Sequence, residues 1–166
     1  LVRRILAAAG ISRSAPVQYD GDWYSIRDVL VYRKDIMQID HRLLSLVRDA
    51  VDKPLQATLY DKEKARAYVA AHRVLDCVSH LNEPLAPDAL VAALRPLAPR
   101  LYSIASSPHA YPGEVHLTVD VLRYDLHGTA RKGVASTFLA ERAGPGVEVS
   151  IFIKENKAFR LADEAV

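Results

Sequence analysis

The spacing of apolar positions along the chain changes near residue 100. Before that point, apolar residues recur every three or four positions, which predicts helices over residues 1–95. After it, β-branched residues partly alternate with polar ones, which predicts three strands, at residues 100–107, 114–125 and 147–154. A helix is predicted over residues 133–144. We therefore predict an α+β chain with a helical domain, residues 1–95, followed by a mainly β domain, residues 96–166.

The first domain contains residues that favour the beginnings and ends of helices. Ser25 and Asp40 are predicted N-caps, because their side chains can accept hydrogen bonds from the free amides of a first helical turn. Gly10 is predicted to end the first helix, and the last helix of this domain is predicted to begin after Pro87. The longest helical pattern, residues 61–81, fits either one helix or two.

The composition and net charge of the chain argue against several kinds of partner and site. The 166 residues are 50% hydrophobic and 25% charged, with a net charge of +2, which is typical of a soluble globular protein and argues against nucleic acid or a membrane surface as the main partner. The single cysteine, Cys77, excludes an internal disulfide and favours a cytoplasmic setting; we predict that it is a buried apolar residue rather than a nucleophile. The six histidines show no metal-ligand spacing, so no metal site is predicted.

The predicted strand "RLYSIASSP", residues 100–108, has unusual residues for a core. A strand that only fills a core favours Val, Ile and Phe, whereas this one combines an arginine, a tyrosine and several small or hydroxyl residues. Arg100 offers a planar set of donors that fits a phosphate, and Tyr102 offers a flat face for a ring. The alternative is an edge strand with a solvated arginine.

The segment "HGTARKGVASTFL", residues 127–139, predicts a helix that begins at a glycine followed by small residues. A helix start of this kind presents free amides and the positive end of the helix dipole, which suits a phosphate. The alternative is a helix start that is small only because it is tightly packed. Taken together, the two segments favour one ligand with a flat ring system and a pyrophosphate.

Four segments carry a family resemblance. "PRLYSIASSP", "EVHLTVDVLRYD", "RKGVASTFLAER" and "VSIFIKENKAFRL", in this order and spacing, resemble the FAD-binding domain of the diflavin reductase family, most of all its sulfite reductase flavoprotein group. The resemblance is strong over residues 88–161 and looser over the helical domain. It implies a helical connecting subdomain followed by part of an antiparallel, ferredoxin reductase-like FAD-binding β-barrel.

The resemblance also implies a set of cofactor-binding residues and no catalytic residue in this chain. Arg100 and the start of the last helix would hold the FAD pyrophosphate, Tyr102 would lie against the isoalloxazine ring, and Ser103 would hydrogen-bond near its reactive nitrogen. The second predicted strand would lie along the flavin. The full implied set is Arg100, Leu101, Tyr102, Ser103, Thr118, Val119, Asp120, Tyr124, Gly133, Val134, Ala135 and Ser136.

The chain departs from the family pattern at three positions. Asp120 places a carboxylate where relatives have a small or apolar residue, so it would either disfavour reduced flavin or face solvent. Met37 stands where relatives often have a threonine that contacts FAD, and alanine follows "FRL" where proline is usual.

The predicted function follows from the resemblance. The NADPH-binding and FMN-binding modules of the family are not within these 166 residues, the first residue is Leu1 and the only methionine is Met37, so we expect a piece of a longer reductase. That reductase would pass electrons from NADPH through FAD towards FMN and an acceptor such as the sulfite reductase haemoprotein. Its partner would be an electron-acceptor protein or a fused FMN module. The alternatives are a flavin-free remnant or interaction module, and a reductase for a haem or nitrate-reducing acceptor.

Overall fold

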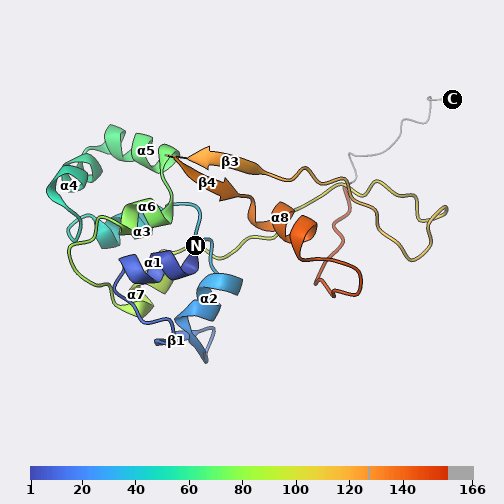
Figure 1. The fold of residues 1–166 in the computed structure, drawn as a ribbon, viewed down its shortest axis with the longest axis horizontal. Helices are drawn as coiled ribbons and strands as arrows, with labels where there is room; N and C mark the ends of the chain where they lie inside the picture. Colours follow the sequence, from blue (N-terminus) through green and yellow to red (C-terminus); the bar gives the residue numbers. More distant parts are fainter. Residues whose placement is uncertain (127, 157–166) are drawn as a thin grey trace. The chain divides into compact units, whose positions relative to one another are not determined.

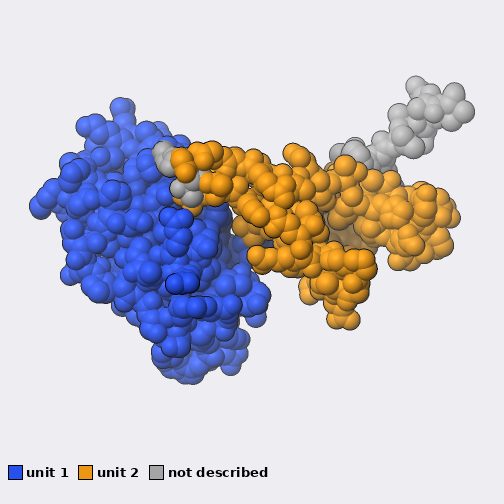
Figure 2. All heavy atoms as spheres, viewed as in Figure 1, with its two compact units in different colours: residues 1–99 blue, residues 100–166 orange. Residues whose placement is uncertain are grey.

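A computed structural model describes residues 1–126 and 128–156, and these divide between two compact units (Figure 2). Unit 1 comprises residues 1–99 and unit 2 comprises residues 100–166, and each is described by itself. His127 and the "FRL" motif at residues 159–161 lie outside the described residues.

Unit 1 is a helical bundle with one hairpin (Figure 1). Its helices are α1 (Val2–Ala8), α2 (Ile26–Tyr32), α3 (His41–Val47), α4 (Lys53–Tyr60), α5 (Lys62–Ala71), α6 (Val74–Val78) and α7 (Pro87–Ala93). The hairpin joins β1 (Pro16–Tyr19) to β2 (Asp22–Ser25) in antiparallel register.

The helix boundaries follow the capping chemistry of the sequence. The Ser25 hydroxyl accepts a hydrogen bond from the Asp28 amide at 3.2 Å, and the Asp40 carboxylate accepts one from the Arg42 amide at 2.9 Å. Both residues are N-caps, as predicted. The 61–81 pattern forms two helices, α5 and α6, because the backbone is extended at His72 and Arg73.

The β1–β2 hairpin and helix α4 are absent from the sequence-based prediction. The hairpin turns at Asp20 and Gly21, where both residues have positive φ, 52° and 92°. Asp-Gly is a preferred dipeptide for such a turn, because glycine adopts positive φ without a steric penalty. The Asp20–Gly21 dipeptide is therefore a turn signal in the sequence, although the strands on either side of it are short, with four residues each.

The apolar core of the described residues lies within unit 1. Every buried apolar side chain falls between Ile5 and Leu94, and the largest of those fully enclosed are Ile5, Leu6, Ile26, Leu30, Leu43, Leu90 and Leu94. Cys77 belongs to this core, as predicted, and burial raises the pKa of its thiol to about 12, with Asp76 adding to the effect. A thiol in that environment is protonated and inert at neutral pH.

The described residues of unit 2 contain one regular hairpin and one helix. Strands β3 (Arg123–Leu126) and β4 (Thr129–Lys132) pair antiparallel, and helix α8 (Val134–Glu141) follows at once. The predicted helix at 133–144 is therefore confirmed over most of its length.

The predicted strands of unit 2 are largely wrong. Residues 100–107 and 114–121 make only one isolated bridge, Ile104 to Leu117, and residues 147–154 form no strand. Residues 125–133, predicted as a loop, contain most of the β3–β4 hairpin. A strand needs a hydrogen-bonding partner as well as β-branched residues, and among the described residues of unit 2 only β3 and β4 have a ladder.

Three absences concern the described residues only. Residues 1–126 and 128–156 contain two two-stranded sheets and no closed barrel. The same residues contain no cluster of His, Cys, Asp or Glu suited to a metal ion, and none of their helices is long and apolar enough to cross a membrane.

Gly10 offers a test of the packing between α1 and the segment before α7. Its φ is 67°, and an added Cβ would lie 2.8 Å from the Pro84 Cβ. Gly21 has a φ of 92° but nothing within 4 Å of an added Cβ. We expect Gly21→Ala to cost about 1 kcal/mol through backbone strain, and Gly10→Ala about 1–3 kcal/mol more through overpacking, measured by urea unfolding. Equal losses for the two variants would contradict the Gly10–Pro84 contact.

Candidate functional site

The candidate site begins with the uncapped start of helix α8. Gly133 is the N-cap, and no side chain caps the helix. The Gly133 amide donates to the Leu122 carbonyl at 2.8 Å, while the amides of the first helical turn have no intrahelical acceptor. Val134 is half exposed. This end of α8 therefore offers backbone donors and the positive end of a helix dipole to an anion.

The small residues at this helix start are also required by packing. An added Cβ on Gly133 would lie 2.6 Å from the Ser136 Oγ and 3.0 Å from the Leu122 Cβ. The buried Ser136 hydroxyl accepts a hydrogen bond from the Leu122 amide at 3.2 Å, and the Thr137 hydroxyl donates to the Gly133 carbonyl. The Ser136 oxygen thus accepts a hydrogen bond inside the unit, while the proton of its hydroxyl and its backbone amide are the groups that can donate to an anion.

An ion-pair cluster binds the other end of α8 to the hairpin. Glu141, the last residue of α8, lies 2.8 Å from Arg123 and 2.9 Å from Lys132, which are register partners on β3 and β4. Hydrogen bonds from Lys132 and then Arg123 lower the pKa of Glu141. Lys132, which lies next to Gly133 in the sequence, is therefore engaged at the C-terminal end of the helix.

Unlike Lys132, the side chains of Arg100 and Tyr102 have no ion pair or hydrogen bond with another described residue. Arg100 is exposed, and within residues 1–126 and 128–156 it forms no salt bridge. Leu101 and Ser103 are exposed, and Tyr102 is partly buried. The guanidinium is thus open to an external anion.

Ser106, in the same stretch, has a structural role. Its hydroxyl accepts a hydrogen bond from the His116 amide at 3.1 Å, and the neighbouring Ala105 amide donates to the His116 carbonyl at 2.8 Å. The Tyr111 and His116 rings lie 4.5 Å apart at 48°. These contacts hold residues 104–117 as an irregular hairpin. The presence of the Ser106 hydroxyl is therefore explained by an internal hydrogen bond, without a ligand.

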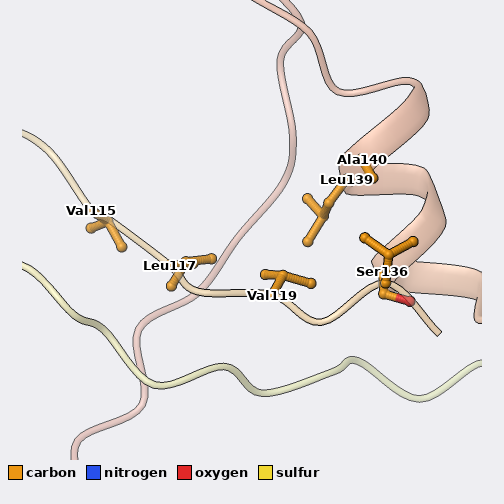
Figure 3. A pocket seen from close by; sticks show the side chains of 7 residues that line it. Val115, Leu117, Val119, Ser136, Leu139 and Ala140 are labelled. Carbon is orange, nitrogen blue, oxygen red and sulfur yellow. The ribbon is translucent and has the colours of Figure 1, made fainter.

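A pocket of about 370 Å³ lies between residues 115–121 and α8 (Figure 3). Its lining residues are Val115, Leu117, Val119, Val121, Ser136, Leu139 and Ala140. The valines and leucine alternate along an extended segment, so they share one face of it. Ser136 supplies the only side-chain oxygen among these residues, and backbone groups add polar surface, so the pocket offers both apolar and polar surface to a ligand.

The structure brings only some of the predicted site residues together. Val119 and Ser136 line the pocket, whereas Thr118 and Asp120 are exposed and do not line it. Tyr124 is partly buried on β3 opposite Arg131. The exposure of Asp120 agrees with the second of its two alternatives, a carboxylate that faces solvent.

Comparison with known proteins gives one family. Residues 27–138, more than half of the chain, match the family described as FAD binding domain. The chain is also similar to proteins named sulfite reductase [NADPH] flavoprotein alpha-component. It is 38% identical to that of Vibrio parahaemolyticus over 99% of the chain, and 39% identical to that of Salmonella arizonae over 97%. It is 37% identical to that of Escherichia coli O157:H7 over 97% of the chain.

The matched relatives are much longer than the chain, which spans 26% or 27% of their length. The resemblance drawn from the four sequence segments is confirmed by these matches.

Gly133 offers a test of the helix-start geometry. We expect Gly133→Ala to push α8 away from Leu122 and to speed amide hydrogen exchange at Leu122 and Gly133 about tenfold, since overpacking of this kind costs about 1–3 kcal/mol. Combining it with Ser136→Ala should relieve the closer clash and restore protection at Gly133. Gly144→Ala is the control, since an added Cβ there meets nothing within 4 Å. Unchanged exchange at both amides in Gly133→Ala would disprove the contact.

Proposed function

The chain belongs to the FAD binding domain family, and from that premise we propose that residues 100–136 hold the FAD of an NADPH-dependent diflavin oxidoreductase. The observation that carries the proposal is the family match over residues 27–138, which includes both the Arg100–Ser103 run and the start of α8. Similarity to sulfite reductase flavoproteins over nearly the whole chain supports it.

Three groups of residues would bind different parts of FAD. The Arg100 guanidinium and the amides at the start of α8 would hold the pyrophosphate, because both are donors without internal acceptors in the described chain. Tyr102, with Leu101 and Ser103 beside it, would contact the isoalloxazine ring. The remaining contacts would come from Thr118, Val119, Asp120, Tyr124, Gly133, Val134, Ala135 and Ser136.

Contacts within the unit bear on two of these roles. Ser136 would contribute its backbone amide and the proton of its hydroxyl, because the hydroxyl oxygen only accepts a hydrogen bond from the Leu122 amide. Gly133 would contribute chiefly by allowing α8 to begin close to Leu122.

The barrel of the family would be completed by sequence outside this chain. Apolar side chains line part of the pocket beside α8, and further apolar side chains are exposed at Val149, Ile151, Phe152 and Ile153. Further strands would cover these side chains and pair with the backbone of the extended segments. The helical unit would then be the connecting subdomain of the reductase.

The redox chemistry would be that of the cofactor. When bound, FAD would supply hydride-accepting and single-electron chemistry, while the residues of this chain would bind and orient it. NADPH-binding and FMN-binding modules, and an acceptor such as the sulfite reductase haemoprotein, would belong to the whole reductase. A cytoplasmic setting would fit the single, buried cysteine of these 166 residues.

A second candidate is a domain that no longer binds flavin. The absence of any buried apolar residue among the described residues of unit 2 favours it. Protein expressed from the whole gene that is colourless and shows no thermal shift with added FAD would support this candidate against the first.

The FAD contacts can be tested at Arg100 and Tyr102. We expect Arg100→Ala and Tyr102→Ala each to raise the FAD dissociation constant at least about tenfold, since a charge-assisted hydrogen bond to phosphate or a ring contact contributes on the order of 1–3 kcal/mol. Flavin fluorescence titration of apoprotein expressed from the whole gene measures the constant. Arg142→Ala, at an exposed arginine of the same unit, is the matched control. Unchanged affinity in both variants would reject the site.

A further inference from the structure

Two basic residues lie directly opposite each other at the open end of the β3–β4 hairpin, which we call its root. Arg123, the first residue of β3, is the register partner of Lys132, the last residue of β4. Register partners in an antiparallel pair carry their side chains on the same face, and like charges that lie directly opposite destabilise the pairing. The root therefore needs a compensating anion if its two strands are to stay paired.

The backbone places these two side chains at the closer of the two spacings in an antiparallel ladder. The Gly133 amide donates to the Leu122 carbonyl at 2.8 Å, so Leu122 and Gly133 form the next, hydrogen-bonded pair of the same register. Bonded and non-bonded pairs alternate along such a ladder, and side chains lie closer together in the non-bonded pairs. Arg123 and Lys132 therefore form a pair of the closer type.

One carboxylate, that of Glu141, compensates both charges. Its Oε1 accepts a hydrogen bond from the Arg123 Nη2 at 2.8 Å, and the Lys132 Nζ lies 2.9 Å from Oε1 and 3.0 Å from Oε2. Among residues 1–126 and 128–156, no other acidic side chain forms a salt bridge with either cation. Within this part of the chain, Glu141 is thus the group that holds the two cations together.

The position of Glu141 in its helix supports this explanation. It is the last residue of α8, where the negative end of the helix dipole disfavours an acidic side chain. The helix taken alone would be more stable with a neutral residue at this position. The glutamate is therefore explained by its contacts with the hairpin.

The root of the hairpin also sets where α8 begins, because β4 leads directly into this helix (Figure 1). The Leu122–Gly133 pair continues the ladder directly beyond the two cations, and Gly133 is the N-cap of α8. The Leu122 amide donates to the Ser136 hydroxyl, in the first turn of the helix, at 3.2 Å. This first turn is thus built on the last pair of the ladder, and all of these contacts lie within unit 2.

We propose that Glu141 is a positioning residue for the cofactor: by neutralising Arg123 and Lys132 it keeps the root paired, and thereby holds the first turn of α8 at Leu122. The role toward FAD rests on the proposed function, in which the amides of that turn bind the pyrophosphate. The pairing of the root is independent of it. Glu141 lies at the opposite end of α8 from that turn, so it acts through the hairpin.

The first test measures the root without any cofactor, by amide hydrogen exchange of apoprotein expressed from the whole gene. In Glu141→Gln we expect exchange at Leu122 and Gly133 to speed about fivefold at low salt, the scale of a lost network of exposed ion pairs. About 1 M NaCl should remove most of this difference, because salt screens the repulsion between the two cations. Glu148→Gln, at an exposed glutamate of the same unit, is the matched control and should change neither amide.

A double variant separates charge repulsion from a general loss of structure. When Glu141→Gln is combined with Lys132→Gln, only Arg123 stays charged, so we expect exchange at both amides to return to within about twofold of the unaltered rate. Loss of the charge at the helix end would by itself slow exchange, because a neutral residue suits the helix dipole better. Unchanged or slower exchange in Glu141→Gln, or faster exchange that neither salt nor Lys132→Gln reverses, would overturn the inference.

The second test measures FAD affinity in the same variants by flavin fluorescence titration. We expect Glu141→Gln to weaken FAD binding about fivefold at low salt, and the double variant to recover most of this loss. Tighter binding in Glu141→Gln would overturn the inference, because it would mean that the released Lys132 reaches the cofactor. Equal affinity would also overturn it and would leave the proposed function standing. Absence of FAD binding in the unaltered protein would reject the proposed function and the positioning role together.

Discussion

Extended chain is stable only when its backbone amides and carbonyls have partners, and this requirement separates the two units of the chain. Unit 1 meets it with helices, whose hydrogen bonds are local, and encloses every buried apolar side chain of the described residues. Unit 2 contains long extended segments, but only β3 and β4 form a ladder. Its alternating apolar residues therefore line an open pocket or remain exposed instead of meeting in a core. Under the proposed function, further strands of the reductase and bound FAD would be the partners of these residues.

The ordered parts of unit 2 are those with local hydrogen bonds, and they include the residues that suit an anion. The β3–β4 hairpin leads directly into α8, Gly133 and Ser136 fasten the helix start to Leu122, and Glu141 fastens its end to the hairpin. The start of α8, to which the proposed function assigns pyrophosphate binding, is thus held by contacts within unit 2, although the strands expected around it are not paired among the described residues.

The sequence predicted what depends on neighbouring residues. Ser25 and Asp40 were recognised as caps because capping involves residues two or three positions away, and the helix after Gly133 was recognised from its small first turn. The runs at 100–107 and 147–154 were predicted as strands, which was wrong here because pairing depends on distant partners that composition does not reveal. The Asp20–Gly21 turn carried a local signal that was missed. Lys34 gave no signal at all: a lysine is expected at the surface, and only the fold shows its ammonium buried against Leu94 and Tyr19.

The central claim is that residues 100–136 bind FAD while unit 1 provides a core that is already complete. Amide hydrogen exchange of the protein expressed from its whole gene, measured with and without FAD, tests this most directly. The account predicts that FAD slows exchange at residues 100–104 and 133–136 and leaves the core helices of unit 1, such as α3 and α6, unchanged. Slowing confined to unit 1, or no change in either segment of unit 2 at saturating FAD, would contradict it.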